Sequence, residues 1–372
     1  MISKILVINP GATSTKIATF RGDDMIFQES AAHGASQLKA FDSLADQIPY
    51  RKKLVSEILD RREIKYGELD AIVGRGGILA PLPGGVYEVS EELLIDARSM
   101  KYGEHASCLG PLLAGEFAGM AGCAAFIVDP VSTDEFIPEA RYSGLAGIDR
   151  VSRFHALNQK AVARKVAESI GKRYEDARFV AVHLGTGISV GAHLNGRVAD
   201  ACDAMNEGSF SVDRAGSVPV LAVVDMCFER GYSRKEAKLR LNGEGGVYSY
   251  LGTKDMHEVE NRVQAGDCAA RGVVEAFAFQ VAKDIGAMAA VCSGRVDRVI
   301  ITGGMARFGL LTELIRSRVE FIAPVEIVPG EEEMSALAEG AMRVLNGETR
   351  ALDYSEEKRK RLRREELVKN KS

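Results

Sequence analysis

Two glycine-rich segments carry the amide and hydroxyl side chains that a phosphate-binding hairpin needs. They read VINPGATSTK and VHLGTGIS, and strand-like runs lie on both sides of the glycines. Rows of backbone N–H groups in such turns bind anions without a lysine. The candidate phosphate ligands are Asn9, Gly11, Thr13 and Ser14 in the first segment and Gly185, Thr186, Gly187 and Ser189 in the second. Because glycines are equally typical of tight turns, either segment alone is also consistent with an ordinary hairpin.

The glycine-rich loops of other nucleotide-binding proteins do not match these segments. The chain has no G-x-x-x-x-G-K-[ST] loop and lacks the motif set of protein kinases. GTGISVG approaches the dinucleotide-binding fingerprint, but its third glycine comes one position late. A strand and the Asn195-Gly196 turn follow it, where that fingerprint requires a helix. The sequence therefore favours two hairpins over a Rossmann-type site.

Charged residues near apolar runs could complete a site for phosphate and carboxylate groups. Arg75 stands in VGRGG and Arg214 in SVDRAGSVP. A planar guanidinium suits both anions, although a surface ion pair is the alternative for each arginine. Asp129 follows the apolar run AAFIV, a common position for a Mg²⁺ ligand and also for a turn cap. Three glutamates, residues 331–333, follow VPG at the start of a predicted helix, where the helix dipole alone favours acids.

Length and composition indicate a globular protein of two domains. The chain has 372 residues, of which 46% are hydrophobic, so it can bury a large core. With 48 Lys and Arg against 52 Asp and Glu, it lacks the basic excess of a nucleic-acid-binding protein. No apolar run is long enough for a membrane span or a signal-peptide core. The scattered cysteines, without a C-x-x-C pair, fit a reduced compartment, so we expect a cytoplasmic protein.

The hydrophobic pattern predicts alternating strands and helices that would position these residues. Strands are predicted over residues 5–8, 16–20, 26–29, 69–73 and 124–128, and again over 179–184, 188–194, 197–201, 298–302 and 325–328. Helices are predicted over 42–65, 91–101, 106–121, 153–170, 219–229, 234–241, 259–290 (interrupted near Gly266) and 333–345. The highly charged tail, 355–372, is predicted to form a solvated helix.

The two halves of the chain resemble each other where they begin. VINPGATSTKIA and VHLGTGISVGA both read as strand, glycine-rich turn and strand, and aligning Gly11 with Gly185 gives an offset of 174 residues. A chance likeness between two hairpins is one explanation. The other is a duplicated fold with one phosphate-binding hairpin in each copy.

A series of motifs in a fixed order resembles the acetate/butyrate kinase family of the sugar-kinase, Hsp70 and actin superfamily, and the butyrate kinases most closely. The motifs are VINPGATSTK, VGRGG, GEHAS, FIVDPVSTDEF, RFHALNQ, VHLGTGIS, DRAGSVP, DMHEVE, ITGGMA and VPGEEE. The resemblance implies an α/β protein of two actin-like (ribonuclease H-like) domains, with a mixed sheet in each and an active-site cleft between them. Residues 1–150 plus 340–372 would form the N-terminal domain, which binds the acyl substrate and carries the first hairpin. Residues 151–339 would form the nucleotide-binding C-terminal domain.

The resemblance implies an ATP-dependent kinase that converts butyrate and ATP reversibly into butyryl phosphate and ADP by direct in-line transfer. ATP or ADP and Mg²⁺ would be its cofactors. We expect a homodimer or larger homo-oligomer, with no nucleic-acid or membrane partner. A kinase for acetate, propionate or a branched-chain acid, or for a sugar, is the alternative within the same architecture. An ATP-dependent binding protein like Hsp70 or actin is the alternative of another class.

The resemblance also assigns roles to residues, motif by motif. The catalytic residues it implies are Arg75, Asp129, His155 and Arg214. The substrate-binding residues are Asn9, Arg75, Gly77, His105 and Phe154. The nucleotide-binding residues are Asn9, Gly11, Ser14, Lys16, His183, Gly185, Thr186, Gly187, Asp255, His257, Gly303 and Gly304. Asp129 and Glu332 would hold Mg²⁺, with Glu331 and Glu333 as alternatives to Glu332.

The chain departs from the acetate kinase pattern in ways that affect these assignments. Ala12 replaces a serine of the first hairpin, and His257 replaces an arginine near the adenine. Gly76 and Gly77 follow Arg75 where acetate kinases carry branched residues. We hypothesise that the missing side chain at Gly77 leaves room for a longer acyl tail.

The chemistry of the implied reaction requires cations rather than a base. A fatty-acid carboxylate has a pKa of roughly 4–5 and is already ionised at neutral pH. Two like unit charges about 4 Å apart repel by about 4 kcal/mol at an effective dielectric of about 20. We therefore expect Arg75 to orient the carboxylate, and Arg214 and His155 to neutralise the transferring phosphoryl group.

Overall fold

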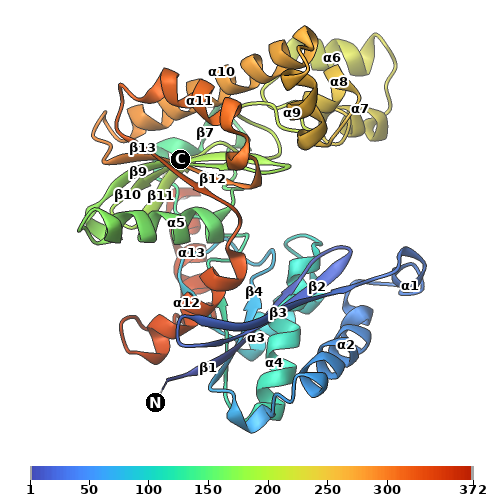
Figure 1. The fold of residues 1–372 in the computed structure, drawn as a ribbon, viewed down its shortest axis with the longest axis vertical. Helices are drawn as coiled ribbons and strands as arrows, with labels where there is room; N and C mark the ends of the chain where they lie inside the picture. The colour runs from blue at the N-terminus through green and yellow to red at the C-terminus, as the bar shows by residue number, and fades with distance from the viewer. Residues whose placement is uncertain (1, 370–372) are drawn as a thin grey trace. The chain divides into compact units, whose positions relative to one another are not determined.

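The computed structural model describes residues 2–369, apart from the side chains of residue 35 and residues 364–369. The chain divides into two compact units. The N-terminal unit comprises Met1–Asp134 together with Glu332–Ser372, and the central unit comprises Glu135–Glu331. Each unit is built on one main mixed sheet with helices against it (Figure 1).

A mixed sheet of six strands forms the centre of the N-terminal unit. Its strands are β1 (Lys4–Pro10), β2 (Ser14–Arg21), β3 (Asp24–Ala32), β4 (Ala71–Arg75), β5 (Val86–Glu88) and β6 (Ala124–Val128). Their order is β3-β2-β1-β4-β6-β5. The first three strands pair antiparallel, whereas β1, β4 and β6 run parallel. The carboxyl ends of those parallel strands therefore share one edge of the sheet.

Helices cover the N-terminal sheet because its central strands are apolar on both faces. The helices are α1 (Ala35–Leu38), α2 (Ile48–Arg61), α3 (Glu91–Ser99), α4 (Leu109–Ala121), α12 (Glu333–Leu345) and α13 (Tyr354–Lys369), with short 3₁₀ helices η1 (Ala45–Gln47), η2 (Tyr66–Glu68) and η3 (Ala106–Cys108). Leu6 and Ile8 of β1 share a core with α2 and α4. Gly340 of α12 packs closely on Val128 of β6.

The central unit has a mixed sheet of five strands. They are β9 (Arg178–Leu184), β10 (Ile188–Leu194), β11 (Arg197–Ala201), β12 (Arg298–Gly303) and β13 (Val325–Pro329), and a separate hairpin consists of β7 (Tyr142–Leu145) and β8 (Ile148–Asp149). The order of the main sheet is β11-β10-β9-β12-β13. β9, β12 and β13 run parallel, and the strands β9, β10 and β11 pair antiparallel.

Alternating side chains of β9 pack against helices on both faces of this sheet. The helices of the unit are α5 (Ala156–Ser169), α6 (Val220–Phe228), α7 (Arg234–Leu241), α8 (Gly246–Leu251), α9 (Met256–Gln264), α10 (Cys268–Val291) and α11 (Gly309–Val319), with 3₁₀ helices η4 (Pro138–Arg141), η5 (Tyr174–Asp176) and η6 (Gly304–Arg307). Val180 and Val182 join the core of α10, whereas Phe179 and Ala181 join the core of α5. The predicted interruption near Gly266 separates α9 from α10, and Asp267 caps α10.

The two units repeat one topology, which confirms the duplicated fold. β9 begins 174 residues after β1, the offset that the glycines predicted. In each unit this strand has an antiparallel hairpin partner on one side and a parallel strand on the other. The expected mixed sheet in each of two α/β domains is thus confirmed.

The boundaries between the units differ from the predicted positions, 150 and 340. Phe136 and Ala140 pack with Val198 of β11, and the Ile137 amide donates to the Ala199 carbonyl at 2.9 Å, so residues 135–150 belong to the central unit. The whole of α12 belongs to the N-terminal unit. Such long-range contacts leave no local signal in the sequence.

The charged tail forms the predicted helix, α13, and this helix is anchored where it begins. Tyr354 is fully buried, and its hydroxyl donates to Asp96 Oδ2 at 2.8 Å. The ammonium of Lys358 bonds the same oxygen at 2.6 Å and Glu92 at 2.7 Å. Burial raises the pKa of Tyr354, and its hydrogen bond to Asp96 raises it further. The final tail residues, 370–372, lie outside the described residues.

Among residues 2–369, no helix is both long and apolar enough to cross a membrane.

Candidate active site

The first predicted phosphate hairpin is the β1–β2 turn of the N-terminal unit. Asn9 and Lys16 are paired across the two strands. The Gly11 amide donates to the Ser14 carbonyl at 2.7 Å and closes the turn. Asn9 is buried, whereas Lys16 is exposed. The structure therefore brings Asn9, Gly11, Ser14 and Lys16 together in one hairpin, and their phosphate-binding roles stay predictions.

Arg51, a buried arginine that no sequence motif indicated, donates hydrogen bonds to this turn from the side of α2. Arg51 of α2 is fully buried, and its guanidinium donates to the Gly11 carbonyl at 3.0 Å and to Thr15 Oγ1 at 2.9 Å. Gln47 accepts two further bonds from it. Burial lowers the pKa of Arg51 to about 10, so it is still charged at neutral pH. A fixed positive charge in contact with a turn favours the binding of an anion to that turn. In the sequence, YRKK reads as an ordinary charged helix surface.

His33 makes the stability of this hairpin depend on pH. Its Nε2 lies 2.9 Å from Thr15 Oγ1, and burial, together with the charge of Arg51, lowers its pKa from 6.5 to about 4. Between these values the unfolded chain binds more protons than the folded chain, so the free energy of unfolding should fall as the pH drops through this window. Urea unfolding from pH 7 to pH 4 should show a shallower fall for His33→Gln than for wild type. His257→Gln, at an exposed position, is the control; equal slopes for all three proteins would contradict this.

Arg75 ends β4 in a setting that requires the glycines around it. A Cβ on Gly74 would overlap the Gly110 carbonyl, and a Cβ on Gly76 would lie 2.6 Å from Pro130 Cβ. Side chains at these positions are therefore excluded by close packing against α4 and the segment after β6. The glycines of VGRGG thus allow close packing around the end of β4, and Arg75 is the one long side chain of the motif.

Arg75 lies in a cluster of polar groups, which we call the Arg75 cluster: Asn9, Arg75, His105 and Glu333. The Arg75 guanidinium forms an ion pair with Glu333 Oε1, and Asn9 Nδ2 donates to Glu333 Oε2 at 2.8 Å. Burial lowers the pKa of His105, and the charge of Arg75 lowers it further, against the effect of Glu333. His105 Nδ1 accepts the Ser107 amide at 3.2 Å, which leaves the ring proton on Nε2. The cluster can therefore bind a carboxylate through a guanidinium, an amide and an imidazole.

Asp129 lies at the same sheet edge, directly after β6. It is 2% exposed, adopts a positive φ of 37°, and its amide donates to the Gly85 carbonyl at 2.8 Å. In phosphate-transfer sites Mg²⁺ takes one or two carboxylates together with phosphate oxygens and water, and this buried carboxylate fits that chemistry. Within residues 2–369, no group of three acidic, histidine or cysteine side chains forms a complete protein cage. Glu332 is exposed at the N-cap of α12, and its metal role stays a prediction.

The space beside Gly77 is filled, which counts against the hypothesis that it accommodates a longer acyl tail. A Cβ at this position would lie 2.5 Å from Cys108 Cα and 2.8 Å from its backbone nitrogen. Those are backbone atoms of the segment that leads into α4, so they cannot rotate away. Gly77 is required by packing, and a substrate contact at this residue stays a prediction.

Gly77→Val should therefore destabilise the N-terminal unit rather than change acyl selectivity alone. Overpacking of this kind costs about 1–3 kcal/mol, so the unfolding temperature in calorimetry should drop. Gly119→Ala is the matched control, because a Cβ there meets no atom within 4 Å and alanine favours the helix. An unchanged unfolding temperature with a new acid preference would restore the original hypothesis.

The second predicted hairpin is the β9–β10 turn of the central unit, and Arg214 lies against it. The Gly185 amide donates to the Gly187 carbonyl at 3.2 Å, with Thr186 between them. A Cβ on Gly187 would overlap the Arg214 guanidinium, so the glycine permits this approach. Arg214 Nη1 also donates to the Ala204 carbonyl at 2.6 Å. The turn and the arginine thus form one cationic anion-binding surface.

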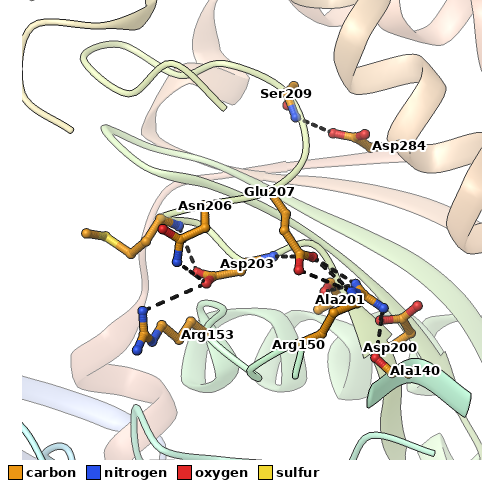
Figure 2. A network of polar contacts seen from close by, with 11 residues as sticks. Ala140, Arg150, Arg153, Asp200, Ala201, Asp203, Asn206, Glu207, Ser209 and Asp284 are labelled. Atoms are coloured by element: carbon orange, nitrogen blue, oxygen red, sulfur yellow. Dashed lines mark hydrogen bonds and ion pairs between the residues drawn. The ribbon is translucent and has the colours of Figure 1, made fainter. Parts of the chain in front are cut away.

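An ion-pair network holds the loop that follows β11 (Figure 2), and Arg214 comes farther along this loop in the sequence. Arg150 contacts Asp200 and Glu207, each at 2.9 Å. Asp203 accepts from Asn206 at 2.7 Å and lies 3.9 Å from Arg153. Farther along the loop, the Ser209 amide donates to Asp284 Oδ2 at 2.6 Å, and burial raises the pKa of Asp284. The network fixes the loop from β11 onward and so positions Arg214.

His155 and His183 form a stacked pair beside this hairpin. Their ring centroids are 3.8 Å apart with an interplanar angle of 14°. His155 is the N-cap of α5, and His183 lies in β9 with its Nε2 3.2 Å from Glu331 Oε1. Phe154, next to His155, is 5% exposed within the small core around Phe136. The central unit therefore places His155 and Arg214, which are predicted to act on the phosphoryl group, beside the same β9–β10 hairpin.

The predicted adenosine-side residues lie on separate elements. Gly303, at the end of β12, has a φ of 94° and exchanges backbone hydrogen bonds with Gly330. A Cβ on Gly304 would meet no atom within 4 Å. Asp255 caps α9 by accepting the His257 amide at 2.9 Å, and both side chains are exposed. In the described part of the chain, no hydrogen bond or ion pair joins Asp255 or His257 to the hairpin turn, so their nucleotide roles stay predictions.

Solved structures share this fold. The acetate kinase of Porphyromonas gingivalis matches with a TM-score of 0.76 at 19% identity, over 92% of this chain and 100% of that one. The acetate kinase of Entamoeba histolytica matches with a TM-score of 0.73 at 15% identity, over 91% and 98%. A propionate kinase of Francisella tularensis subsp. tularensis SCHU S4 matches with a TM-score of 0.70 at 16% identity, over 91% and 99%. These likenesses confirm the actin-like α/β fold.

The sequence of the central unit carries the family signature itself. The model of the acetokinase family matches residues 136–322, which is half of the chain. This segment includes both stacked histidines, the second hairpin and Arg214. The chain is therefore a phosphotransferase of the acetokinase family.

Proposed function

We propose that this protein transfers the γ-phosphoryl group of ATP to the carboxylate of a short-chain fatty acid, and that butyrate is its preferred acid. The products are ADP and butyryl phosphate, and the reaction is reversible. One observation carries the proposal: Arg75, at the end of a buried strand, already binds a carboxylate, that of Glu333. The preference for butyrate rests on the resemblance of the ordered motifs.

The residues of the Arg75 cluster account for recognition of the acid. Arg75 supplies a permanent charge, and Asn9 and the Nε2–H of His105 supply neutral donors. The substrate carboxylate is ionised at neutral pH, so none of these groups has to remove a proton. Their task is to hold the nucleophilic oxygen in line with the phosphoryl group.

The hairpin of the central unit accounts for charge compensation during transfer. Arg214 lies against the turn at Gly187, and His155 lies beside it on α5. We assign both to the equatorial oxygens of the transferring phosphoryl group, where fixed donors contribute most. Asp129 and Glu332 would hold Mg²⁺, which neutralises charge on the nucleotide phosphates when bound. The adenosine would contact the elements that carry Asp255, His257, Gly303 and Gly304.

Trapping of the acyl phosphate with hydroxylamine tests this function directly. The protein is incubated with ATP, Mg²⁺ and acetate, propionate, butyrate, isobutyrate or no acid. Hydroxamate from butyrate well above that from acetate supports the full proposal. A preference for acetate or propionate, the substrates that the structural neighbours are named for, retains the mechanism and changes the substrate. ATP hydrolysis without any acid-dependent product would overturn the proposal in favour of an Hsp70-like or actin-like activity.

We further expect a homodimer or larger homo-oligomer in the cytoplasm. Light scattering after size-exclusion chromatography would measure the assembly, and a mass near the 40.2 kDa of one chain would contradict it.

A further inference from the structure

We infer that a buried chain of hydrogen bonds from Tyr174 through His193, Gln159 and Ser189, which we call the relay, holds His155 as a neutral imidazole with its proton on Nε2. These four residues would then be positioning residues for the reaction. The tautomer follows from the geometry alone, and only its catalytic meaning rests on the proposed function.

The chain of contacts is continuous, and it is closed to solvent from Tyr174 to Ser189, whereas His155 at its end is half-buried. Tyr174 Oη lies 2.8 Å from His193 Nδ1, and His193 Nε2 lies 3.1 Å from Gln159 Oε1. Gln159 Nε2 donates to Ser189 Oγ at 2.9 Å, and Ser189 Oγ lies 2.8 Å from His155 Nδ1. The side chains of the relay are at most 4% exposed. Water therefore does not compete for these bonds, and each group must be satisfied by its neighbour.

One backbone contact fixes which group donates in each hydrogen bond between Tyr174, His193 and Gln159. Gln159 Nε2 also lies 3.1 Å from the Ser189 carbonyl oxygen, which can only accept. The amide nitrogen must therefore face Ser189, and Oε1 must face His193. Because Oε1 only accepts, His193 Nε2 carries a proton and donates it. In the neutral ring His193 Nδ1 is then an acceptor, and it receives the Tyr174 hydroxyl proton.

A second backbone contact fixes which group donates in the hydrogen bond between Ser189 and His155. The His155 amide donates to Ser189 Oγ at 3.2 Å, and Gln159 Nε2 donates to the same atom. A serine hydroxyl has two acceptor sites and one proton. Both acceptor sites are filled by groups that can only donate, so the hydroxyl proton is directed to His155 Nδ1. A proton on that nitrogen would break this arrangement, and the ring proton of His155 therefore lies on Nε2.

His183, which stacks on His155, also favours a neutral His155 ring. Asn158 Nδ2 donates to the Gly330 carbonyl at 3.5 Å, so its Oδ1 accepts from His183 Nδ1 at 2.7 Å. His183 Nε2 then faces the carboxylate of Glu331. Two imidazolium rings about 4 Å apart would repel by about 4 kcal/mol at an effective dielectric of about 20. A charge on His183, beside the Glu331 carboxylate, would therefore oppose a second charge on His155. The titratable group stacked on His155 is thus His183, and Glu331 contacts the far nitrogen of that ring.

For the proposed reaction, the relay makes His155 a constant neutral donor. Its Nε2–H can bond a phosphoryl oxygen without first gaining a proton, and it keeps this capacity through the neutral pH range. The charge at the phosphoryl group is then supplied by Arg214 and the metal. A histidine that acted as a cation would instead lose activity as the pH rose above its pKa.

Long-range ¹H–¹⁵N NMR of the full-length protein labelled at its six histidines tests the tautomer without any turnover. We expect His155, assigned by His155→Gln, to show one protonated nitrogen, Nε2, and one unprotonated nitrogen, Nδ1, unchanged from pH 8 to pH 5.5. Two protonated nitrogens at neutral pH, or a proton on Nδ1, would overturn the inference. Tyr174→Phe provides a milder probe, because loss of the hydroxyl donor should alter the ring nitrogen shifts of His193; unaltered shifts would remove Tyr174 from the relay.

Ser189→Ala tests what the relay does. Without the hydroxyl, nothing holds the ring proton of His155 on Nε2, so the ¹H–¹⁵N pattern at pH 8 should show both tautomers and kcat at pH 8 should fall several-fold. Lowering the pH to 5.5 should recover part of this loss, because a protonated ring always carries a proton on Nε2. Ser169→Ala is the control, because the Ser169 hydroxyl donates to the Val166 carbonyl of the same helix at 2.8 Å, and it should keep the wild-type pH profile. A wild-type profile and tautomer in Ser189→Ala would overturn the inference. Failure of the proposed function is distinguishable, because the NMR pattern would persist in a protein that forms no acyl phosphate.

Discussion

Arg75→Ala should lower kcat/KM for the fatty acid about a thousandfold. The guanidinium offsets a repulsion of about 4 kcal/mol between carboxylate and phosphate, and each 1.36 kcal/mol corresponds to a factor of about ten. The dissociation constant for ATP should stay close to that of wild type, because the hairpins and Arg51 remain. Steady-state kinetics with the acid varied, and ATP binding by calorimetry, would measure the two effects separately.

Controls for this prediction follow from the contacts of Arg75. The variant leaves the Glu333 carboxylate without its cation, so the substrate would meet an added negative charge. Arg75→Ala combined with Glu333→Gln should therefore recover roughly tenfold of the loss, in proportion to the removed repulsion. Arg62→Ala, at an exposed ion pair with Glu29, should change the rates less than about twofold, since surface pairs contribute little. Near-normal turnover in Arg75→Ala would remove this residue from the mechanism.

Arg214→Ala should lower kcat by roughly 10²–10⁴, with a smaller effect on KM for the acid. The guanidinium lies against the second hairpin, where the transferring group would sit, and it would strengthen its contact as charge shifts in the transition state. A loss of that kind appears in kcat and kcat/KM together. Single-turnover measurements at saturating ATP and acid would isolate the chemical step from product release.

A loss of order in the loop that carries Arg214 would also lower kcat. A variant of the ion-pair network that holds this loop tests that explanation. Arg150→Met removes the contacts to Asp200 and Glu207 but retains the Arg214 side chain. It should lower the stability of the central unit more than Arg214→Ala does and lower kcat less. Arg173→Ala, at an exposed pair with Asp176, should leave turnover within about twofold of wild type. Wild-type kcat in Arg214→Ala would discard direct charge compensation by this residue.

Local signals explain what could be predicted from the sequence. The β1–β2 and β9–β10 hairpins come from apolar runs interrupted by glycines, and both the pattern and its 174-residue offset lie in contiguous letters. The positions of Asn9, Arg75 and Asp129 at one sheet edge follow similarly, because each stands near the end of a buried run that becomes one of three parallel strands. The interruption at Gly266 is equally local.

Contacts between distant residues explain what could not be predicted. Asn9 and Glu333 are 324 positions apart, and nothing local shows which glutamate of the VPGEEE run reaches Arg75. Arg51 lies among other basic residues, and only burial separates it from them. Gly77 suggested an open acyl pocket, but the space is filled by the backbone of Cys108, in the 3₁₀ helix η3 before α4.

The sequence by itself determined the duplicated α/β topology, the two hairpins and, through its ordered motifs, the family, because hydrophobic period, turn residues and motif order are local or linear properties. Only the tertiary structure decided which groups meet: Glu333 at Arg75, Arg51 beneath the first turn, and the relay that orients His155. Burial and hydrogen-bond direction set the charge and the proton position of each group. Both depend on neighbours that the fold brings together from distant parts of the chain.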